Sequence, residues 1–187
     1  MSFKAICLMM CILEFNGACL WFDSSIFMSG RKYHKIVDKY IYGRNSSMVF
    51  YIHSTGHNLA WATHPEMLSF LPSNVTRMLE PENLMNQGGA VIVYNTFEFQ
   101  QHVMQWALRC SLIQECIAPS YQLAPLSWVG GNDIHYCNAS VHRFTPYNCH
   151  RYDQSMWNIL VYNLYDWDRS KFQTLPMDWL GNAKRIG

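Results

Sequence analysis

A short apolar segment that ends in a single acid constrains this chain most. Residues 18–22 read Ala-Cys-Leu-Trp-Phe, and Asp23, Ser24 and Ser25 follow directly. Five largely apolar residues predict a buried strand. In open α/β sheets, ligands bind at the carboxyl ends of strands, which is where this segment places Asp23. Because an unpaired carboxylate is costly to bury, Asp23 is a candidate site residue, with a turn anchor or helix cap as the alternative.

Hydrophobic periodicity predicts the other elements of an α/β domain. A buried helix is expected over residues 3–15, which are apolar nearly all round, and it ends at Asn16 and Gly17. Further helices are expected over residues 31–42, 65–70, 74–79, 97–111 and 154–165, and further strands over residues 48–52 and 90–94. Thr96 suits the cap of one of these helices. Strands that alternate with helices indicate the α/β class.

The bulk composition fits one folded domain and excludes some classes of partner. The chain has 187 residues, of which 50% are hydrophobic and 14% charged, so it can bury a core. Its formal net charge is +1 and no basic run exceeds two residues, so a nucleic-acid partner is not expected. No stretch reaches the roughly 18 apolar residues that span a bilayer. We therefore treat residues 1–187 as a single domain without a membrane span.

The seven cysteines favour disulfide chemistry over metal binding. Cys110 and Cys116 are six residues apart, and Cys137 and Cys149 are twelve apart, so either pair could close a loop in an oxidising compartment. Zinc is the less favoured alternative because no Cys-x-x-Cys spacing is present. The other three lie in apolar surroundings and are expected to be buried thiols: Cys7, Cys11 and Cys19.

The amino-terminal residues allow two interpretations. Lys4 and the apolar run over residues 5–13 resemble a short signal peptide, with residues 16–18 as the cleavage site. A core helix is favoured, because Glu14 interrupts the run and a strand begins soon afterwards. Three N-x-[ST] sequons give weak support to a secretory route: those at Asn45, Asn74 and Asn138.

Three loops carry side chains that could do chemistry. Asp23 ends a strand, residues 86–89 form a Gly-Gly turn before a strand, and residues 149–154 precede a helix. In an α/β sheet such loops can converge on one crevice. A strand-end carboxylate can hold a hard divalent cation or a sugar hydroxyl. Paired glycines let the backbone approach a ligand, although a plain turn is their commoner explanation.

The loop before the last predicted helix supplies three candidates. Asp153 suits a helix amino terminus, and as a lone residue it is more often a cap than a base. His150 can be a metal ligand or a proton carrier, although a lone histidine is more often structural. Arg151 can pair with a phosphate or with Asp153. His57 and His64, seven residues apart, fit no helix-face metal pair and are assigned no role.

Five segments, read in order, match one known pattern: LWFDSS, STGHNLAWATHPEMLSFLP, NQGGAVIVYNT, WALRCSLIQECIAP and CHRYDQSMWNIL. Together they resemble an animal family of largely uncharacterised glycosyltransferase-like proteins, expanded in nematodes, with a GT-A fold. The resemblance covers a core of residues 3–165 and leaves residues 166–187 as an irregular tail. More distantly, the order of strand-Asp, Asn-x-Gly-strand and Asp-Gln-helix is similar to that of the glycogenin-like retaining glycosyltransferases.

The resemblance implies a partial GT-A-like, Rossmann-like mixed sheet flanked by helices, and it implies roles for site residues. Asp23 would contact the donor or its Mn²⁺, and His150 would be a further metal ligand. Asp153 and Gln154 would be the catalytic pair beside the reacting sugar. The implied substrate contacts are Asn86, Gln87, Gly88, Gly89 and Arg151.

Two departures from the family pattern qualify these roles. Ser24 and Ser25 follow Asp23 where the usual motif carries a second acid, so the site could work without a metal. The nucleotide-binding βα portion that opens such domains does not precede Asp23, and neither does a membrane anchor. The chain is therefore expected to be a truncated domain.

The resulting hypothesis is a transferase that moves a sugar from a nucleotide-sugar donor to a glycan or protein acceptor. A full-length form would be a type II membrane protein of the Golgi or endoplasmic reticulum, with Cys110 and Cys116 joined in its lumen. One alternative is an inactive fragment or carbohydrate-binding remnant of such a domain. Another is a small secreted disulfide protein that has lost residues 1–18.

Overall fold

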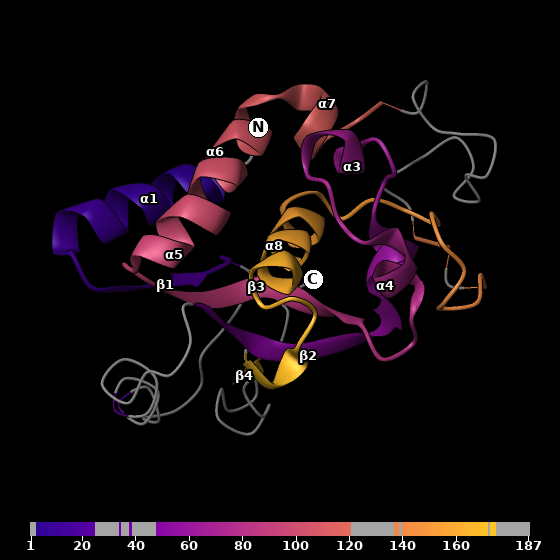
Figure 1. Cartoon of the computed structure of the whole chain (residues 1–187), viewed down its shortest axis with the longest axis horizontal. Helices are drawn as coiled ribbons and strands as arrows, with labels where there is room; N and C mark the ends of the chain where they lie inside the picture. Colours follow the sequence, from indigo (N-terminus) through magenta and orange to yellow (C-terminus); the bar gives the residue numbers. More distant parts are fainter. Residues whose placement is uncertain are drawn as a thin grey trace.

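Three antiparallel strands form the sheet on which the helices pack (Figure 1). β3 (Leu84–Tyr94) lies between β1 (Ala18–Phe22) and β2 (Met48–Asn58). The two-residue β4 (Gln173–Thr174) pairs in parallel with β2, so the sheet is mixed. This computed structural model describes residues 3–24, 34, 38, 48–120, 137–138, 140–171 and 173–174. The helix expected over residues 31–42 falls almost entirely outside these ranges, as does Asn45.

The mixed α/β class predicted from the sequence is confirmed, but the main strands run antiparallel rather than in the parallel sense of an open α/β sheet. Along β1 and β3, Ala18 lies opposite Tyr94 and Phe22 lies opposite Ala90. The next residue, Asp23, continues this register, because its backbone N–H donates to Gly89 O at 2.7 Å. The carboxyl end of β1 therefore meets the middle of β3.

β3 is longer than predicted. It begins at Leu84, so residues 86–89 lie inside the strand, and the expected Gly-Gly turn before it was wrong. The pairing of this segment with β2 is irregular, with register shifts between Phe50 and Asn58. Such bulges are common beside functional sites, since they redirect the backbone without ending the strand.

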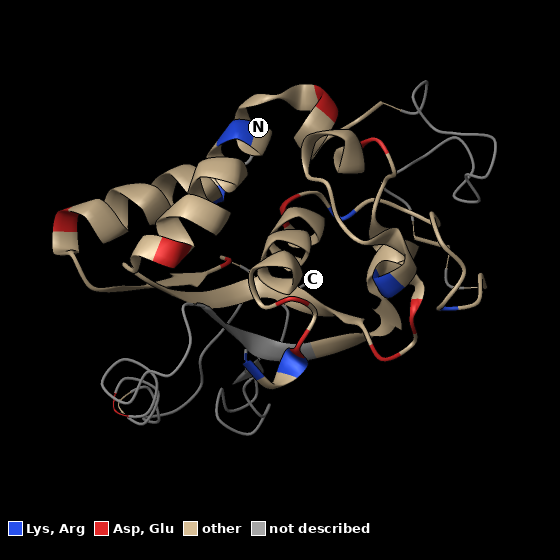
Figure 2. Ribbon diagram, viewed as in Figure 1, with Lys and Arg blue, Asp and Glu red and all other residues tan. Residues whose placement is uncertain are grey.

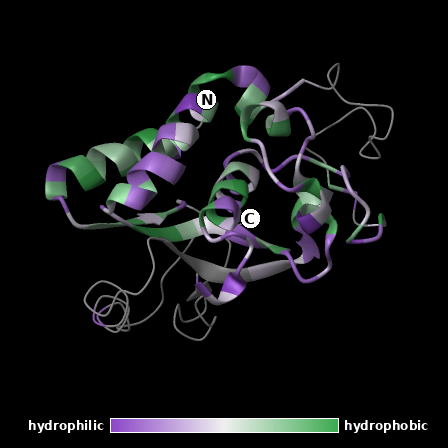
Figure 3. Cartoon of the chain, viewed as in Figure 1, coloured by the Kyte–Doolittle hydropathy of each residue, from purple (hydrophilic) through white to green (hydrophobic). Residues whose placement is uncertain are grey.

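The first helix, α1 (Phe3–Phe15), has the predicted bounds, and Asn16 ends it in the left-handed conformation at φ 44°. The expectation that this helix is buried was only half right. One face, which includes Leu8 and Ile12, is buried, whereas Phe3 and Phe15 are 65% and 73% exposed. Figure 3 shows the hydrophobic colour over much of this helix. Although α1 is apolar on nearly all sides, only one of its faces is buried.

The remaining helices lie mainly on the same side of the sheet as α1 (Figure 1). Their bounds are Met67–Phe70 (α3), Val75–Leu79 (α4), Phe97–Phe99 (α5), Gln105–Leu112 (α6), Gln114–Ile117 (α7) and Tyr152–Leu164 (α8). A π-helical turn over Gln100–Met104 joins α5 to α6, and the Thr96 side chain caps α5 as predicted. Short 3-10 turns occur at Leu59–Ala62 and Arg169–Lys171. In the described ranges no helix is long and apolar enough to cross a bilayer.

α8 is the central helix of the core. Eight of its residues are buried, and Trp157 is among the largest side chains excluded from solvent. It packs against β3, α6 and α7, so its amino end is held between the sheet and the neighbouring helices. This placement matters for the site, because Asp153 lies in the first turn of α8.

Three disulfides cross-link the described residues. The bonds Cys110–Cys116 and Cys137–Cys149 are the two pairings that the spacing allowed, and both are present. The expectation of buried thiols at the other three cysteines was wrong. Cys11 and Cys19 form a third disulfide, because the turn at residues 16–17 brings α1 back alongside β1, and Cys7 is an exposed thiol. Disulfides of this number are typical of proteins that fold in an oxidising compartment.

Removal of the Cys11–Cys19 bond should destabilise the protein. We expect the pair of substitutions Cys11→Ala and Cys19→Ala to lower the free energy of unfolding by about 2 kcal/mol, because a short closed loop is released in the unfolded chain. Urea unfolding measures this change, with Cys7→Ala as the control that should have little effect. Mass spectrometry after alkylation of the unreduced protein should find Cys7 modified; modification of Cys11 and Cys19 would contradict the pairing.

Candidate functional site

A cavity of about 380 Å³ lies where the amino ends of α1 and α8 approach the end of β1. Its lining combines three charged residues with aromatic and aliphatic ones: Phe3, Lys4, Trp21, Asp23, Ile117, Ala118, Tyr152 and Asp153. Lys, Arg, Asp and Glu residues are sparse and scattered over the described helices and strands (Figure 2). A second cavity, of about 460 Å³, lies beside Trp106 and Leu164, and none of the candidate site residues predicted from the sequence lines it.

Lys4 is the centre of this site. Its Nζ lies 2.7 Å from Asp153 Oδ2 and 3.2 Å from Asp23 Oδ1, and it donates to Gly88 O at 2.8 Å. Only 6% of the lysine side chain is exposed. A nearly buried ammonium is tolerated when its partners are charged and hydrogen-bonded, as these are. Lys4 therefore joins Asp23, Gly88 and Asp153, which the sequence had predicted for one site, although Lys4 itself had been assigned no role there.

Gly88 is needed for the approach of α8 to the sheet. A Cβ atom at this position would lie 3.3 Å from both Cα and Cβ of Gln154. The absence of a side chain lets the first turn of α8 pack directly on β3. This contact places Asp153 within reach of Lys4, so Gly88 shapes the site through close packing rather than through a turn.

A row of polar side chains binds α8 to β3. Gln154 Nε2 donates to Asn86 O at 3.1 Å, and Tyr162 Oη donates to Leu84 O at 2.7 Å. Between them, Asn158 Oδ1 accepts from Asn86 N at 2.8 Å, and Asn158 Nδ2 donates to Asn86 O at 2.9 Å. Burial raises the pKa of Tyr162 to about 12, so its hydroxyl remains a donor.

Two predicted site residues, Asn86 and Gln154, belong to this polar row and not to the lining of the cavity. Asn86 is fully buried beneath α8, and Gln154 holds the helix against β3. Asn158 and Tyr162 were not predicted as site residues from the sequence. The available signal was their spacing of four and eight residues from Gln154, which places all three on one face of a helix.

Aromatic side chains orient Asp23 and form one wall of the cavity. Trp21 Nε1 donates to Asp23 Oδ1 at 2.7 Å, and the Lys4 ammonium lies 5.8 Å from the centre of the Trp21 ring. The Phe3 ring meets Trp21 edge-on at 5.7 Å. Tyr152 lines the opposite part at the start of α8 with φ 44°, a left-handed conformation that costs a non-glycine residue about 1–2 kcal/mol. Such strain is concentrated at functional sites.

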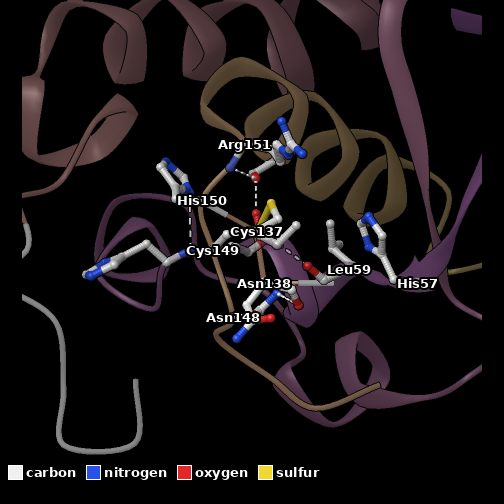
Figure 4. The surroundings of a disulfide bond; sticks show 12 residues. His57, Leu59, Cys137, Asn138, Asn148, Cys149, His150 and Arg151 are labelled. Atoms are coloured by element: carbon white, nitrogen blue, oxygen red, sulfur yellow. Dashed lines mark hydrogen bonds between the residues drawn. A yellow bond between two sulfur atoms is a disulfide. The ribbon is translucent and has the colours of Figure 1, made fainter. Parts of the chain in front are cut away.

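His150 supports the cavity wall from behind. It is fully buried, its Nδ1 accepts from His64 N at 3.1 Å, and its Nε2 lies 3.0 Å from Ile117 O. Because Nδ1 accepts, Nε2 carries the proton and donates to Ile117, which does line the cavity. Figure 4 shows His150 and Arg151 directly after the Cys137–Cys149 bond.

The other predicted substrate contacts are Arg151, Gln87 and Gly89. Arg151 is exposed immediately before α8, and its backbone N–H donates to Ala62 O at 3.1 Å. Gln87 is half-buried in β3, and Gly89 contributes the carbonyl that binds Asp23 N. None of these three lines the cavity.

The residues of this site do not fit the expected Mn²⁺. The ammonium of Lys4 lies between the two carboxylates, where a divalent cation would otherwise bind them, and His150 already binds two backbone groups. Among the residues that the structure describes, no three His, Cys, Asp or Glu side chains are grouped closely enough to hold a metal ion.

Comparison with known proteins gives no match: no family model, no curated protein and no solved structure is significantly similar to this chain.

Two buried histidines, His57 and His64, should make the fold sensitive to acid. Burial lowers the pKa of His57 and of His64 from 6.5 to about 4. Between pH 6.5 and 4 the unfolded chain binds protons that the folded chain does not, so the free energy of unfolding should fall as the pH is lowered through this range. The loss should be on the order of 3 kcal/mol for each histidine.

Urea unfolding across this pH range measures the effect. The variant His57→Gln should reduce the pH dependence by about half, whereas the exposed His102→Gln should leave it unchanged. An unchanged pH dependence in His57→Gln would show that this histidine is not held neutral.

Proposed function

We propose that the cavity binds a sugar and that the chain is glycosyltransferase-like, moving a sugar from a nucleotide-sugar donor to a glycan or protein acceptor. One observation carries the proposal: Asp23, Gly88 and Asp153, which the family resemblance assigns to one site, meet around Lys4 although they are far apart in the sequence. The resemblance to nematode-expanded and glycogenin-like glycosyltransferases supplies the reaction class, and the geometry supports the choice of site.

The lining of the cavity suits a sugar. Carboxylates accept hydrogen bonds from hydroxyl groups, and Asp23 and Asp153 are each partly exposed to the cavity. The rings of Phe3, Trp21 and Tyr152 offer apolar surfaces on which the C–H face of a sugar can pack. The cavity volume of about 380 Å³ is within the range of small-ligand sites.

In this proposal Asp153 is the catalytic residue. Its carboxylate can accept the proton of an acceptor hydroxyl, or stabilise positive charge that develops on the sugar ring during transfer. Gln154 is a positioning residue, because its amide holds the first turn of α8 against Asn86. Arg151, exposed just before α8, is the candidate for a contact with donor phosphate.

The proposed location is the lumen of the Golgi or endoplasmic reticulum, with secretion as the alternative. The three disulfides support an oxidising compartment, which these locations share.

A second candidate function is sugar binding without transfer. The observation that favours it is the pairing of Lys4 with both carboxylates, since the carboxylate oxygen that already accepts from the ammonium is not available to take the proton of an acceptor hydroxyl. This candidate matches the expectation of a carbohydrate-binding remnant.

Replacement of Asp153 by Asn separates these functions. If the chain transfers sugar, Asp153→Asn should lower turnover by roughly 100-fold or more, because the proton acceptor is lost. Transfer is measured with a panel of nucleotide-sugars and saccharide acceptors, with exposed Glu98→Gln as the matched control. Circular dichroism verifies that both variants fold. Unchanged turnover in Asp153→Asn would overturn the assignment, and sugar binding without turnover in the wild type would favour the second candidate.

A further inference from the structure

Lys4 uses all of its hydrogen-bond donors within the site. An ammonium group has three N–H bonds, and three oxygens lie within 3.2 Å of Nζ: one from Asp23, one from Asp153 and the carbonyl oxygen of Gly88. With 6% of its side chain exposed, the lysine also has little contact with the cavity space. A ligand in the cavity could bind this ammonium only by displacing a partner.

The charge of the cluster disfavours an anion. Two carboxylates and one ammonium leave a formal charge of −1, and the other residues that line the cavity are uncharged. Trp21 Nε1, the indole donor of the wall, is already bound to Asp23. A phosphate or diphosphate here would face net repulsion without a charged donor to offset it.

The second oxygen of each carboxylate, on Asp23 and on Asp153, can accept a hydrogen bond from a ligand. Lys4 binds Oδ1 of Asp23 and Oδ2 of Asp153, and no group among the described residues bonds the second oxygen of either carboxylate. The two side chains are 33% and 25% exposed. They therefore present two fixed acceptors beside the aromatic wall, which is the arrangement that recognises a pair of neutral hydroxyl groups.

We infer that this cavity takes a neutral, unphosphorylated sugar ring without a metal ion, and that Lys4 fills the place of a cation as a positioning residue. The inference rests on the proposed function, since it names the part of a transferase substrate that this site holds. The diphosphate of a nucleotide-sugar would then lie outside the cavity.

Direct binding to the full chain tests this inference. Saturation-transfer NMR and calorimetry would use methyl glycosides of glucose, galactose, mannose and N-acetylglucosamine, the matching sugar 1-phosphates, UDP and MnCl₂. At least one neutral glycoside should bind with the same affinity in EDTA and in Mn²⁺. Its 1-phosphate should bind no more tightly than the glycoside, because the cavity offers the phosphate no charged donor.

Variants locate the binding. Asp23→Asn and Asp153→Asn should each weaken the neutral glycoside by roughly tenfold, whereas Glu98→Gln should not change it. The inference is overturned if no neutral glycoside binds, if binding requires Mn²⁺, or if UDP binds and is weakened by Asp23→Asn. Where the two Asn variants unfold, competition between UDP and the glycoside is measured on the wild type instead. Displacement of the glycoside by UDP overturns the inference, and binding of the glycoside that UDP does not affect supports it.

These outcomes separate the inference from the proposed function. Neutral sugar binding without any transfer would end the transferase proposal and leave the inference intact. Sugar transfer accompanied by UDP binding within the cavity would support the proposed function and overturn the inference.

Discussion

The contact of the Lys4 ammonium with Asp23 and Asp153 connects the parts of this molecule that matter for function. It joins α1 to the end of β1 and to the first turn of α8, while a third bond reaches Gly88 in β3. A charge this deeply buried is stable only with its partners in place, and removal of either carboxylate takes away one of the two anions that compensate it. The positions of two helices and two strands are thus mutually dependent, and the cavity lies where they meet.

The covalent cross-links reinforce the same region. Each disulfide lies close in the chain to one wall of the cavity, so the walls are held before a ligand binds and less conformational freedom is lost on binding. The bonds and their neighbours are Cys11–Cys19 between Lys4 and Asp23, Cys110–Cys116 just before Ile117, and Cys137–Cys149 just before Tyr152.

Short-range sequence patterns predicted the first helix and strand, but they could not predict contacts between residues far apart in the chain. The helix over residues 3–15 and the strand over residues 18–22 follow from continuous apolar runs separated by an Asn-Gly break. Residues 86–89 read as a turn because their strand character comes from pairing with β2. The burial of Lys4 depends on partners 19 and 149 residues away, so next to an apolar run it resembled the start of a signal peptide. Asn158 is a similar case, since its partner Asn86 is distant in the sequence.

A double-mutant cycle between Lys4 and Asp153 measures directly whether the lysine couples α1 to α8. The free energy of unfolding in urea is measured for the wild type, Lys4→Met, Asp153→Asn and the double variant. We expect a coupling energy of about 2 kcal/mol or more, because Asp153→Asn takes one carboxylate from the nearly buried ammonium and Lys4→Met leaves Asp153 without its cation, whereas the double variant contains neither charge. The exposed pair Lys171 and Asp168, 3.9 Å apart, is the control and should show little coupling, because solvent screens its charges. A coupling between Lys4 and Asp153 as small as that of the control pair would show that the lysine does not link the two helices.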